Sequence, residues 1–303
     1  MNLQWYPFVF LPVHKPTGPT SHDLVDRIRR VVGKGVKVGH TGTLDPFASG
    51  VLLMAIGKAT KFADFVHELP KAYRAVIRLG VETNTLDPTG EVTAEGEVPD
   101  LDQARLDRVA EALTGRISQV PPAFSAKRVN GRKSYELARK NQAVALAPKH
   151  ITIHHLKLTP LDELRLECEV ACSTGTYVRA LARDIGEALG TPAHLESLER
   201  TSVGPIGLAE CAVPEDLTPE NLAQWSRPVS EVLPRFPEVE LPYRAYTYLV
   251  DGRAFPCETP QPAEFLAVFK RDDVMGAVFR CAYNAELGQV QPKGLCYLAP
   301  DLR

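Results

Sequence analysis

The sequence predicts an α+β fold, because helix-like and strand-like segments follow one another without strict βαβ alternation. Of the 303 residues, 44% are hydrophobic and 24% charged, which is typical of a globular chain with one large domain and a smaller one. No apolar run approaches the roughly 20 residues that a membrane helix needs. Prolines interrupt the apolar stretch at 5–13 and no basic segment precedes it, so we expect a strand there and no signal peptide.

The first elements follow from hydrophobic periodicity. Residues 20–33 are predicted to form a helix, with Thr20 as N-cap, Asp23 completing a capping box and Gly33 at its end. The apolar run at 50–57 indicates a buried segment that is either strand or helix. Alternation at 71–81 predicts a strand.

The later elements are assigned in the same way. We expect an amphipathic helix at 101–115 and another at 176–190, with strands near 151–158 and 163–173 between them. The Pro-bounded stretch at about 120–150 is predicted to leave the core, with a hairpin-like turn at Asn130-Gly131 followed by a short helix.

The last third ends in a separate small module. Residues 218–225 are predicted to form a helix with Thr218 as cap and Pro219 at its first position. A proline-punctuated linker at 234–242 precedes a tail whose strand-like segments are separated by turns. We therefore expect a small all-β module at the C-terminus.

The six cysteines form no zinc-type C-x-x-C pair. Cys168 and Cys172 alternate with acidic and basic residues in a strand pattern, and four strand residues span about 13 Å, too far for a disulfide between them. Reduced, core-facing thiols favour a cytoplasmic protein.

Charge is close to balanced overall, with a formal net charge of -2, but it is unevenly placed. Residues 116–149 hold eight basic side chains against one acid, and residues 1–60 hold seven against three. From residue 191 onward, 16 acids face 10 bases. The two basic zones are compatible with a polyanion-binding face and equally with a solvated surface.

Several kinds of site are absent from the sequence. The segment GKAT at 57–60 lacks the spacing of a phosphate loop, and there is neither an H-E-x-x-H nor a G-x-S-x-G motif. Adjacent His154 and His155 on a strand would point to opposite faces. We therefore predict no metal site.

The remaining chemistry lies in three segments. GHTGTLDPFASG at 39–50 places the single carboxylate of Asp45 in a loop of glycines and small residues. Tyr73 lies on the strand at 71–81 and Arg179 near the start of the helix at 176–190. Taken singly, each has an ordinary explanation: Asp45 as a turn residue, Tyr73 as a core aromatic and Arg179 as a surface charge.

Together, five motifs in this order resemble the TruB family, the bacterial tRNA pseudouridine-55 synthases. They are HKPTGPTSHDLV, VGHTGTLDPFASGVLL, KAYRAVIRLG, PPAFSAKRVNGRKSYELAR and CSTGTYVRALARDIG. The resemblance covers about residues 1–235. It implies a pseudouridine-synthase-like catalytic core at 1–236, with a mixed, mainly antiparallel sheet and flanking helices. It also implies a PUA-like RNA-binding module at 237–303.

The resemblance implies an isomerase that converts uridine to pseudouridine in the T-loop of tRNA and needs no cofactor. Asp45 is then the nucleophile, attacking either C1′ of the ribose or C6 of the uracil, two routes that the sequence leaves open. Arg179 would pair with Asp45 and hold it ionised. Tyr73 would stack on the uracil and could accept the C5 proton.

Further residues are implied to contact the RNA, with the stretch at about 120–150 clamping the T-arm. They are His40, Tyr177, Leu198, Lys15, Lys127, Arg128, Arg132 and Lys133. The implied partner is tRNA, and we expect a monomer without an obligate protein partner or a membrane. Three alternatives stay open: a non-catalytic tRNA-binding or RNA-folding protein, a uridine isomerase acting on ribosomal RNA, and an N-glycosidase that releases uracil.

Overall fold

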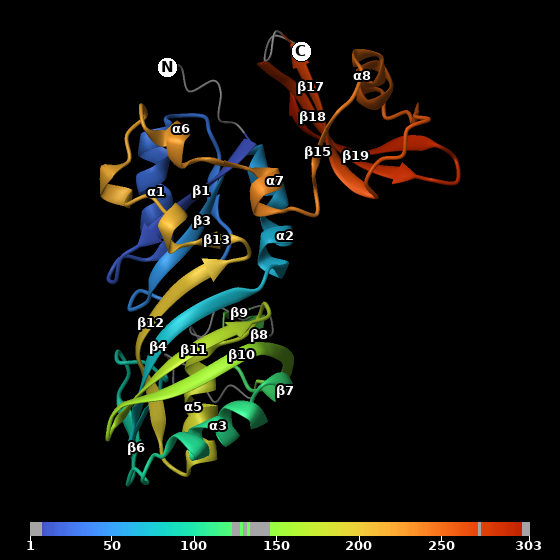
Figure 1. Cartoon of the computed structure of the whole chain (residues 1–303). Coiled ribbons are helices and arrows are strands. Elements are labelled where there is room, and N and C mark those ends of the chain that lie inside the picture. The colour runs from blue at the N-terminus through green and yellow to red at the C-terminus, as the bar shows by residue number, and fades with distance from the viewer. Residues whose placement is uncertain (1–7, 123–127, 130–131, 134–145, 272–273, 299–303) are drawn as a thin grey trace.

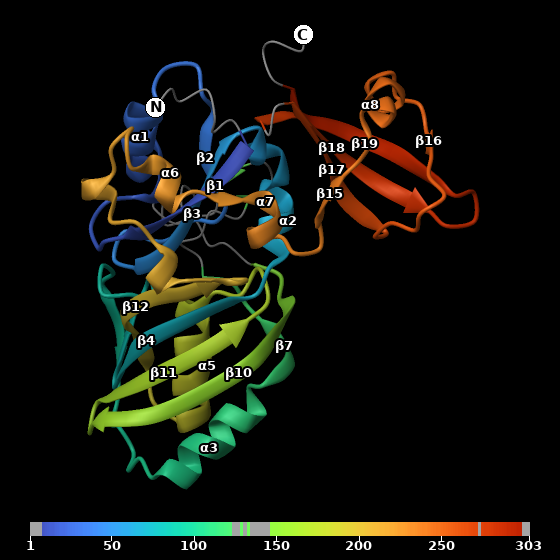
Figure 2. The same ribbon diagram turned by 45° about the horizontal axis from the view of Figure 1, so that its top comes forward.

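The computed structural model describes residues 8–122, 128–129, 132–133, 146–271 and 274–298 (Figure 1). This part of the chain forms a large mixed sheet with helices packed on it and a smaller C-terminal sheet with its own helix (Figure 2). No helix within it is both long and apolar enough to cross a membrane. All six cysteines are free, and Cys168 and Cys172 are buried as predicted.

The large sheet has ten strands in the described residues. They are β1 (Phe8–Lys15), β2 (Val38–His40), β3 (Ser49–Gly57), β4 (Lys71–Leu79), β7 (Gly115–Gln119), β10 (Lys149–Asp162), β11 (Arg165–Cys172), β12 (Ala193–Val203), β13 (Ile206–Gly207) and β14 (Arg227–Pro228). The main path runs β14-β1-β3-β12-β4-β11-β10-β7, with β2 beside β3 and β13 beside β12. All strand pairings in it except β3–β12 are antiparallel, which confirms the predicted mixed, mainly antiparallel sheet.

The β3–β12 pairing joins the two halves of this sheet and is short. Only Ser49 with Glu199 and Gly50 with Arg200 are in register there. In Figure 1 the β1–β3 half lies above this junction and the β4–β11–β10 half below it. The loop between β2 and β3, which carries Asp45, therefore lies where the two halves meet.

Helices cover each half of the sheet. Helix α1 (Ser21–Val32) packs on the β1–β3 half, and its Thr20 cap and Asp23 form the predicted capping box. Helices α3 (Gln103–Ala112) and α5 (Val178–Leu189) pack on the other half. Between the halves, the short helices η2 (Lys58–Phe62) and α2 (Ala63–Glu68) connect β3 to β4.

The C-terminal sheet has five described strands in the order β15-β17-β18-β19-β16. They are β15 (Glu238–Glu240), β16 (Phe255–Pro256), β17 (Glu264–Arg271), β18 (Val274–Asn284) and β19 (Gln289–Leu298). Helix α8 (Tyr243–Val250) covers this sheet, so the module is not all-β as the sequence analysis expected. Side chains of both units share one apolar cluster that includes Phe62, Phe236, Leu266 and Val278.

Other elements are short. They are β5 (Val81–Thr83), β6 (Val92–Glu95), β8 (Arg128–Val129), β9 (Arg132–Lys133), η3 (Leu208–Glu210), η4 (Pro214–Asp216), α6 (Leu222–Trp225) and α7 (Val229–Val232). Strands β8 and β9 pair as the hairpin expected around Asn130-Gly131. The helix predicted after that hairpin falls outside the described residues.

Two helix ends differ from the sequence prediction. The helix expected at 218–225 begins only at Leu222, because Thr218 and Asn221 first close a turn through reciprocal side-chain to backbone hydrogen bonds of 2.9 and 3.4 Å. Helix α3 ends at Ala112 instead of reaching Gly115, which has already entered β7.

Candidate active site

Lys15 fixes the Asp45 loop through hydrogen bonds and does not face solvent. Its side chain is fully buried, and Nζ donates to the carbonyl oxygens of Pro16, Pro46 and Ala48 at 2.9, 3.3 and 2.6 Å. The expectation that Lys15 contacts RNA is therefore wrong, because its three donors are already used within the protein. Burial lowers the pKa of Lys15 to about 8, although the charge of Asp45 opposes that shift.

Arg200 on β12 also holds the Asp45 loop. Its guanidinium donates to the carbonyl oxygens of Val51, Thr43 and Gly42 at 2.7, 3.4 and 3.1 Å, and only 3% of the residue is exposed. Gly50 allows the backbones of β3 and β12 to lie close together here. Its φ is +109°, and a Cβ there would lie 2.2 Å from the backbone carbonyl oxygen of Arg200.

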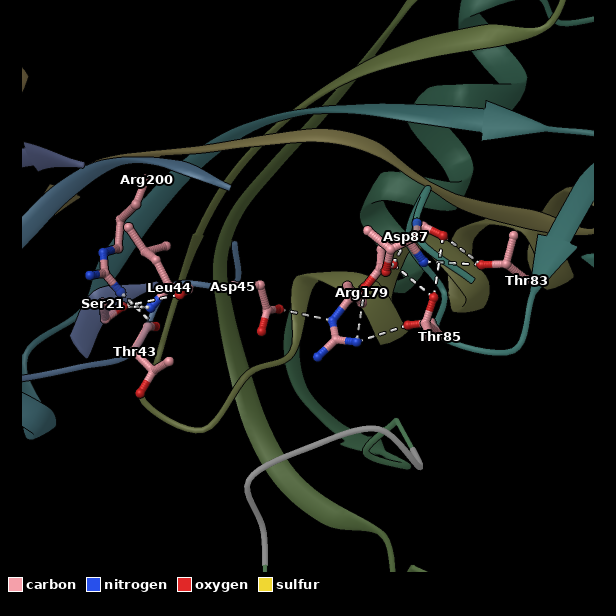
Figure 3. A network of polar contacts seen from close by, with 10 residues as sticks. Ser21, Thr43, Leu44, Asp45, Thr83, Thr85, Asp87, Arg179 and Arg200 are labelled. Carbon is pink, nitrogen blue, oxygen red and sulfur yellow. Dashed lines mark hydrogen bonds and ion pairs between the residues drawn. The ribbon is translucent and has the colours of Figure 1, made fainter. Parts of the chain in front are cut away.

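A third anchor comes from α1. Ser21 Oγ donates to the carbonyl oxygen of Leu44 at 3.0 Å and accepts from the Leu44 N–H at 2.9 Å. Figure 3 shows Ser21, Leu44, Thr43 and Arg200 together on one side of Asp45. Donors from three elements thus fix the residue immediately before the carboxylate and the chain around it.

On its other side, Asp45 meets Arg179, as Figure 3 shows. Arg179 Nε lies 3.0 Å from Asp45 Oδ2, which confirms the predicted ion pair. The same guanidinium lies 3.2 Å from Asp87 Oδ2 and donates to the carbonyl oxygen of Thr85 at 2.9 Å. The Asp45 side chain is 38% exposed, whereas those of Arg179 and Asp87 are 8% and 6% exposed. Of the three charged groups, only Asp45 is open enough to meet a substrate.

Asp87 is held by a turn rich in threonine. Its Oδ1 accepts from the hydroxyls of Thr85 and Thr89 at 2.7 and 2.6 Å and from the Thr89 N–H at 3.0 Å. Its own N–H donates to Thr83 Oγ1 at 3.1 Å. Within this turn Leu86 has a φ of +59°, a left-handed conformation that costs a non-glycine residue about 1–3 kcal/mol. The turn places a buried carboxylate behind Arg179.

The surroundings of Asp45 act on its pKa in opposite directions. Burial raises the pKa of Asp45, and the charge of Asp87 adds to that rise. Arg179 is the main opposing influence and Lys15 a smaller one. The carboxylate is therefore partly withdrawn from water and paired with a fixed cation, an arrangement that suits a nucleophile.

Tyr73 lies on β4 directly opposite Arg200 of β12 and is partly buried. Burial raises the pKa of Tyr73, and the nearby charge of Arg200 opposes this only in part. The phenol therefore stays neutral near pH 7, which weakens its expected role as a base and leaves stacking as its better-supported role.

The apolar side of the site comes from Leu198 and its neighbours. Leu198 is 8% exposed on β12, pairs in register with Ala75, and belongs to a cluster that also contains Leu44. Tyr177 is the N-cap residue of α5, and its N–H donates to Gln119 Oε1 at 2.9 Å. Tyr177 thus lies at the start of the helix that carries Arg179, and Leu198 lies on the strand that carries Arg200.

His40 is the last residue of β2 and pairs in register with Met54. Its Nδ1 is buried and has no hydrogen-bond partner among the described residues. Burial, followed by the nearby charge of His67, lowers the pKa of His40, so the ring is neutral. Of the four basic residues expected in the clamp, Lys127 lies outside the described residues, as do the side chains of Arg128, Arg132 and Lys133.

Asp87 and Arg200 are site residues that the sequence analysis missed. TNTLDPTG at 83–90 places four hydroxyl or amide side chains around one acid, a pattern that could have indicated a held carboxylate. No pattern within the segment could have shown that this carboxylate faces Arg179, which lies 92 positions away.

Comparisons with known proteins give consistent family matches. Residues 29–178 match the family model described as the N-terminal domain of the TruB family pseudouridylate synthases, and 179–232 match the C-terminal domain of tRNA pseudouridylate synthase B. The tRNA pseudouridine synthase B of Bacillus licheniformis is 44% identical over 75% of this chain and 77% of its own length. That of Oceanobacillus iheyensis is 37% identical over 93% and 95%.

The fold extends to more distant structures. A chain in the crystal structure of a Cbf5-Nop10-Gar1 complex superposes with a TM-score of 0.71 at 22% identity, covering all of this chain and 89% of that one. The fold and the matched domains place the protein among the pseudouridylate synthases. Within that class, the chain belongs to the TruB family.

Proposed function

We propose that this protein isomerises uridine to pseudouridine in tRNA, at position 55 of the T-loop. The bond from C1′ to N1 breaks and one from C1′ to C5 forms, while N1 gains a proton and C5 loses one. The observation that carries the proposal is the partly exposed Asp45 carboxylate, paired with a buried Arg179 in a member of the TruB family.

Asp45 would act as the nucleophile, at C1′ or at C6. Three anchors on the loop and the ion pair to Arg179 support this role, because a fixed carboxylate needs little reorganisation to reach its target. The apolar side chains around Leu198 would keep water from the broken glycosidic bond. Tyr73 would stack on the uracil.

The target uridine is stacked within the folded T-loop, so the RNA must release it, at a cost of a few kcal/mol. His40, Tyr177 and the basic clamp residues Lys127, Arg128, Arg132 and Lys133 would contact the RNA around it. Contacts to phosphates would supply much of the affinity.

The wider assignment belongs to the same proposal. Residues 1–236 would form the catalytic domain and 237–303 the RNA-binding module, acting as a monomer in the cytoplasm. The start of the five-stranded sheet at Glu238 supports this division.

The test follows tritium release from a tRNA transcript labelled at uracil C5, with pseudouridine then mapped in the T-loop. Asp45→Asn is run beside the wild type, because it removes the charge with almost no change in shape. We expect release by the wild type and a loss of about 10³-fold or more in the variant, with tRNA affinity retained.

Three other outcomes would each decide against part of the proposal. Tight tRNA binding without release by the wild type would favour the RNA-binding alternative. Release from ribosomal RNA but not from tRNA would favour the other isomerase. Equal release by Asp45→Asn would remove Asp45 from the chemistry.

A further inference from the structure

A cavity of about 210 Å³ lies where the catalytic unit meets the C-terminal module, well apart from Asp45 in the sequence. Its lining includes Lys61 of η2, Arg280 of β18 and Lys293 of β19, and no acidic residue. We call it the junction cavity. Three cationic side chains, one from the catalytic unit and two from the C-terminal module, therefore surround one small cavity.

Two of these cations are fixed in place. Lys61 Nζ donates to the carbonyl oxygen of Leu295 across the junction at 2.8 Å, which leaves two of its three N–H donors available. The guanidinium of Arg280 lies 5.4 Å from the ring centre of Phe65, a cation–π contact. Lys293 is exposed at the rim.

The charge in the junction cavity is not neutralised. Arg235, which packs against the same ring of Phe65, pairs with Glu68 at 3.3 Å and Glu264 at 2.9 Å. Among the residues that the structure describes, no carboxylate lies within 4.0 Å of the charged groups of the three cavity cations. Uncompensated, partly fixed cations around a small cavity favour an anion, and a phosphate can accept from all three.

The position of the junction cavity relates it to the active site. Lys61 lies two residues before the start of α2, whose six residues at 1.5 Å each span about 9 Å. His67, near the far end of α2, lies close enough to His40 to help lower the pKa of that ring, and close enough to Arg200 for its own pKa to be lowered. A strand of RNA leaving the Asp45 loop past His67 would therefore meet the cavity along this helix.

We propose that the junction cavity binds a phosphate group, and that in the complex with RNA this group is a backbone phosphodiester. The assignment of the RNA backbone as its source rests on the proposed function. The site joins the two units around one ligand, so that RNA would be held by both at once.

The test measures tRNA affinity as a function of salt concentration for the wild type and for Arg280→Gln/Lys293→Gln. We expect the slope of log K against log salt to fall in magnitude by roughly 1–2 in the variant, and Kd to rise several-fold. The kcat for tritium release at saturating tRNA should stay at the wild-type value. Lys293→Glu, a change at an exposed side chain, should reduce the slope without affecting the fold.

Arg253→Gln is the matched control. Arg253 also lies over an aromatic ring, that of Tyr248, and belongs to the same module, but it is paired with Asp251 and does not line the cavity. It removes one positive charge from the same module, as each substitution in the double variant does, and we expect its slope to equal that of the wild type.

A second experiment tests whether the phosphate bound in the junction cavity comes from solution or from the RNA backbone. Melting temperatures are measured in inorganic phosphate and in chloride at equal ionic strength. A phosphate-dependent rise lost in the double variant, with unchanged RNA slopes, would support a phosphate site filled from solution. Identical slopes and identical melting in all proteins would overturn the site. A wild type that forms no pseudouridine while the slopes still differ would contradict the proposed function and leave the cavity assignment standing.

Discussion

Arg200 donates to three backbone carbonyl oxygens, and no carboxylate in the described part of the chain pairs with it, so its positive charge is not cancelled by an acidic partner there. That charge contributes to lowering the pKa of Lys15 and of His40, and it opposes the rise in the pKa of Tyr73. Arg200 thus fixes the Asp45 loop through hydrogen bonds, and its charge favours the neutral forms of Lys15 and His40.

Asp87 should set the acid side of the activity profile. Asp45 must be ionised to act, and Asp87 raises its pKa, so in Asp87→Asn the acid limb of kcat/KM should move to lower pH. The rate on the plateau should fall about 10–100-fold, because Arg179 loses its buried partner. The pH profile of tritium release measures both.

Asp184→Asn is the control for that prediction. Asp184 lies on the same helix as Arg179 but pairs with Arg183, so its removal should leave the acid limb in place. An acid limb that moves upward in Asp87→Asn would contradict the role assigned to Asp87.

Lys15 should matter for stability and not for RNA contact. Lys15→Met removes the donor shared by three carbonyl oxygens, of which that of Ala48 is buried and that of Pro46 still accepts from the Gly18 N–H at 2.8 Å, so the free energy of unfolding should fall by about 1–3 kcal/mol. Thermal melting measures this, with the exposed Lys37→Met as a control that stays near the wild type. A changed salt slope of tRNA binding in folded Lys15→Met would restore Lys15 as an RNA contact.

The sequence could predict the site only in part. The pair of Asp45 and Arg179 was reached through motifs that resemble a family, and the structure confirms the ion pair. Lys15 was misassigned because a lysine beside a loop is usually exposed, and its burial depends on carbonyl groups 31 and 33 positions away. Arg200 lies 149 positions from Val51, a contact that no local pattern encodes.

At the scale of elements, the short parallel pairing of β3 with β12 decides where the Asp45 loop lies. Helix α1 and strand β4 were predictable because periodicity and caps are local properties of the chain. Helix α8 was not, because its short run of aromatic and β-branched residues has no strong helix preference and is stabilised by packing on its sheet.

Gly50→Ala should disrupt the pairing of β3 with β12. Its Cβ would overlap the backbone of Arg200 at 2.2 Å, and φ is +109°, so we expect a loss of about 3 kcal/mol or more in stability. Tritium release should fall with it, because the overlap pushes β12 away from the loop.

Gly35→Ala is the matched control, since Gly35 also has a positive φ, +86°, but nothing lies within 4 Å of its Cβ. It should cost only about 1 kcal/mol, the backbone strain alone. Unfolding curves for the two variants separate contact from strain. Equal losses would mean that the approach of β3 to β12 is not important.

At the scale of the whole molecule, the two sheets are joined by aromatic packing. Phe236 is fully buried, and its ring centre lies 5.7 Å from that of Phe62 and 4.9 Å from that of Phe65. Arg235 pairs with a glutamate of each unit, Glu68 and Glu264. We therefore expect the wild type to unfold as one cooperative unit.

Phe236→Ala should separate the two units. The cavity it creates should cost about 3–5 kcal/mol, and calorimetry should then show two transitions where the wild type shows one. Phe255→Ala, in the core of the C-terminal module and away from the junction, should lower stability without the same division. Two transitions in the wild type itself would contradict this view of the junction.

The three anchors on the Asp45 loop have a consequence for how substrate and protein share the work of recognition. Lys15, Ser21 and Arg200 come from three different elements, and their donors hold the loop before any RNA arrives. The backbone N–H groups of 42–48, apart from Pro46 which has none, should then be as ordered as the sheet on the picosecond to nanosecond timescale, with order parameters near 0.85. The rearrangement that brings uridine and carboxylate together would fall on the nucleic acid, and RNAs whose T-loop opens readily should react fastest.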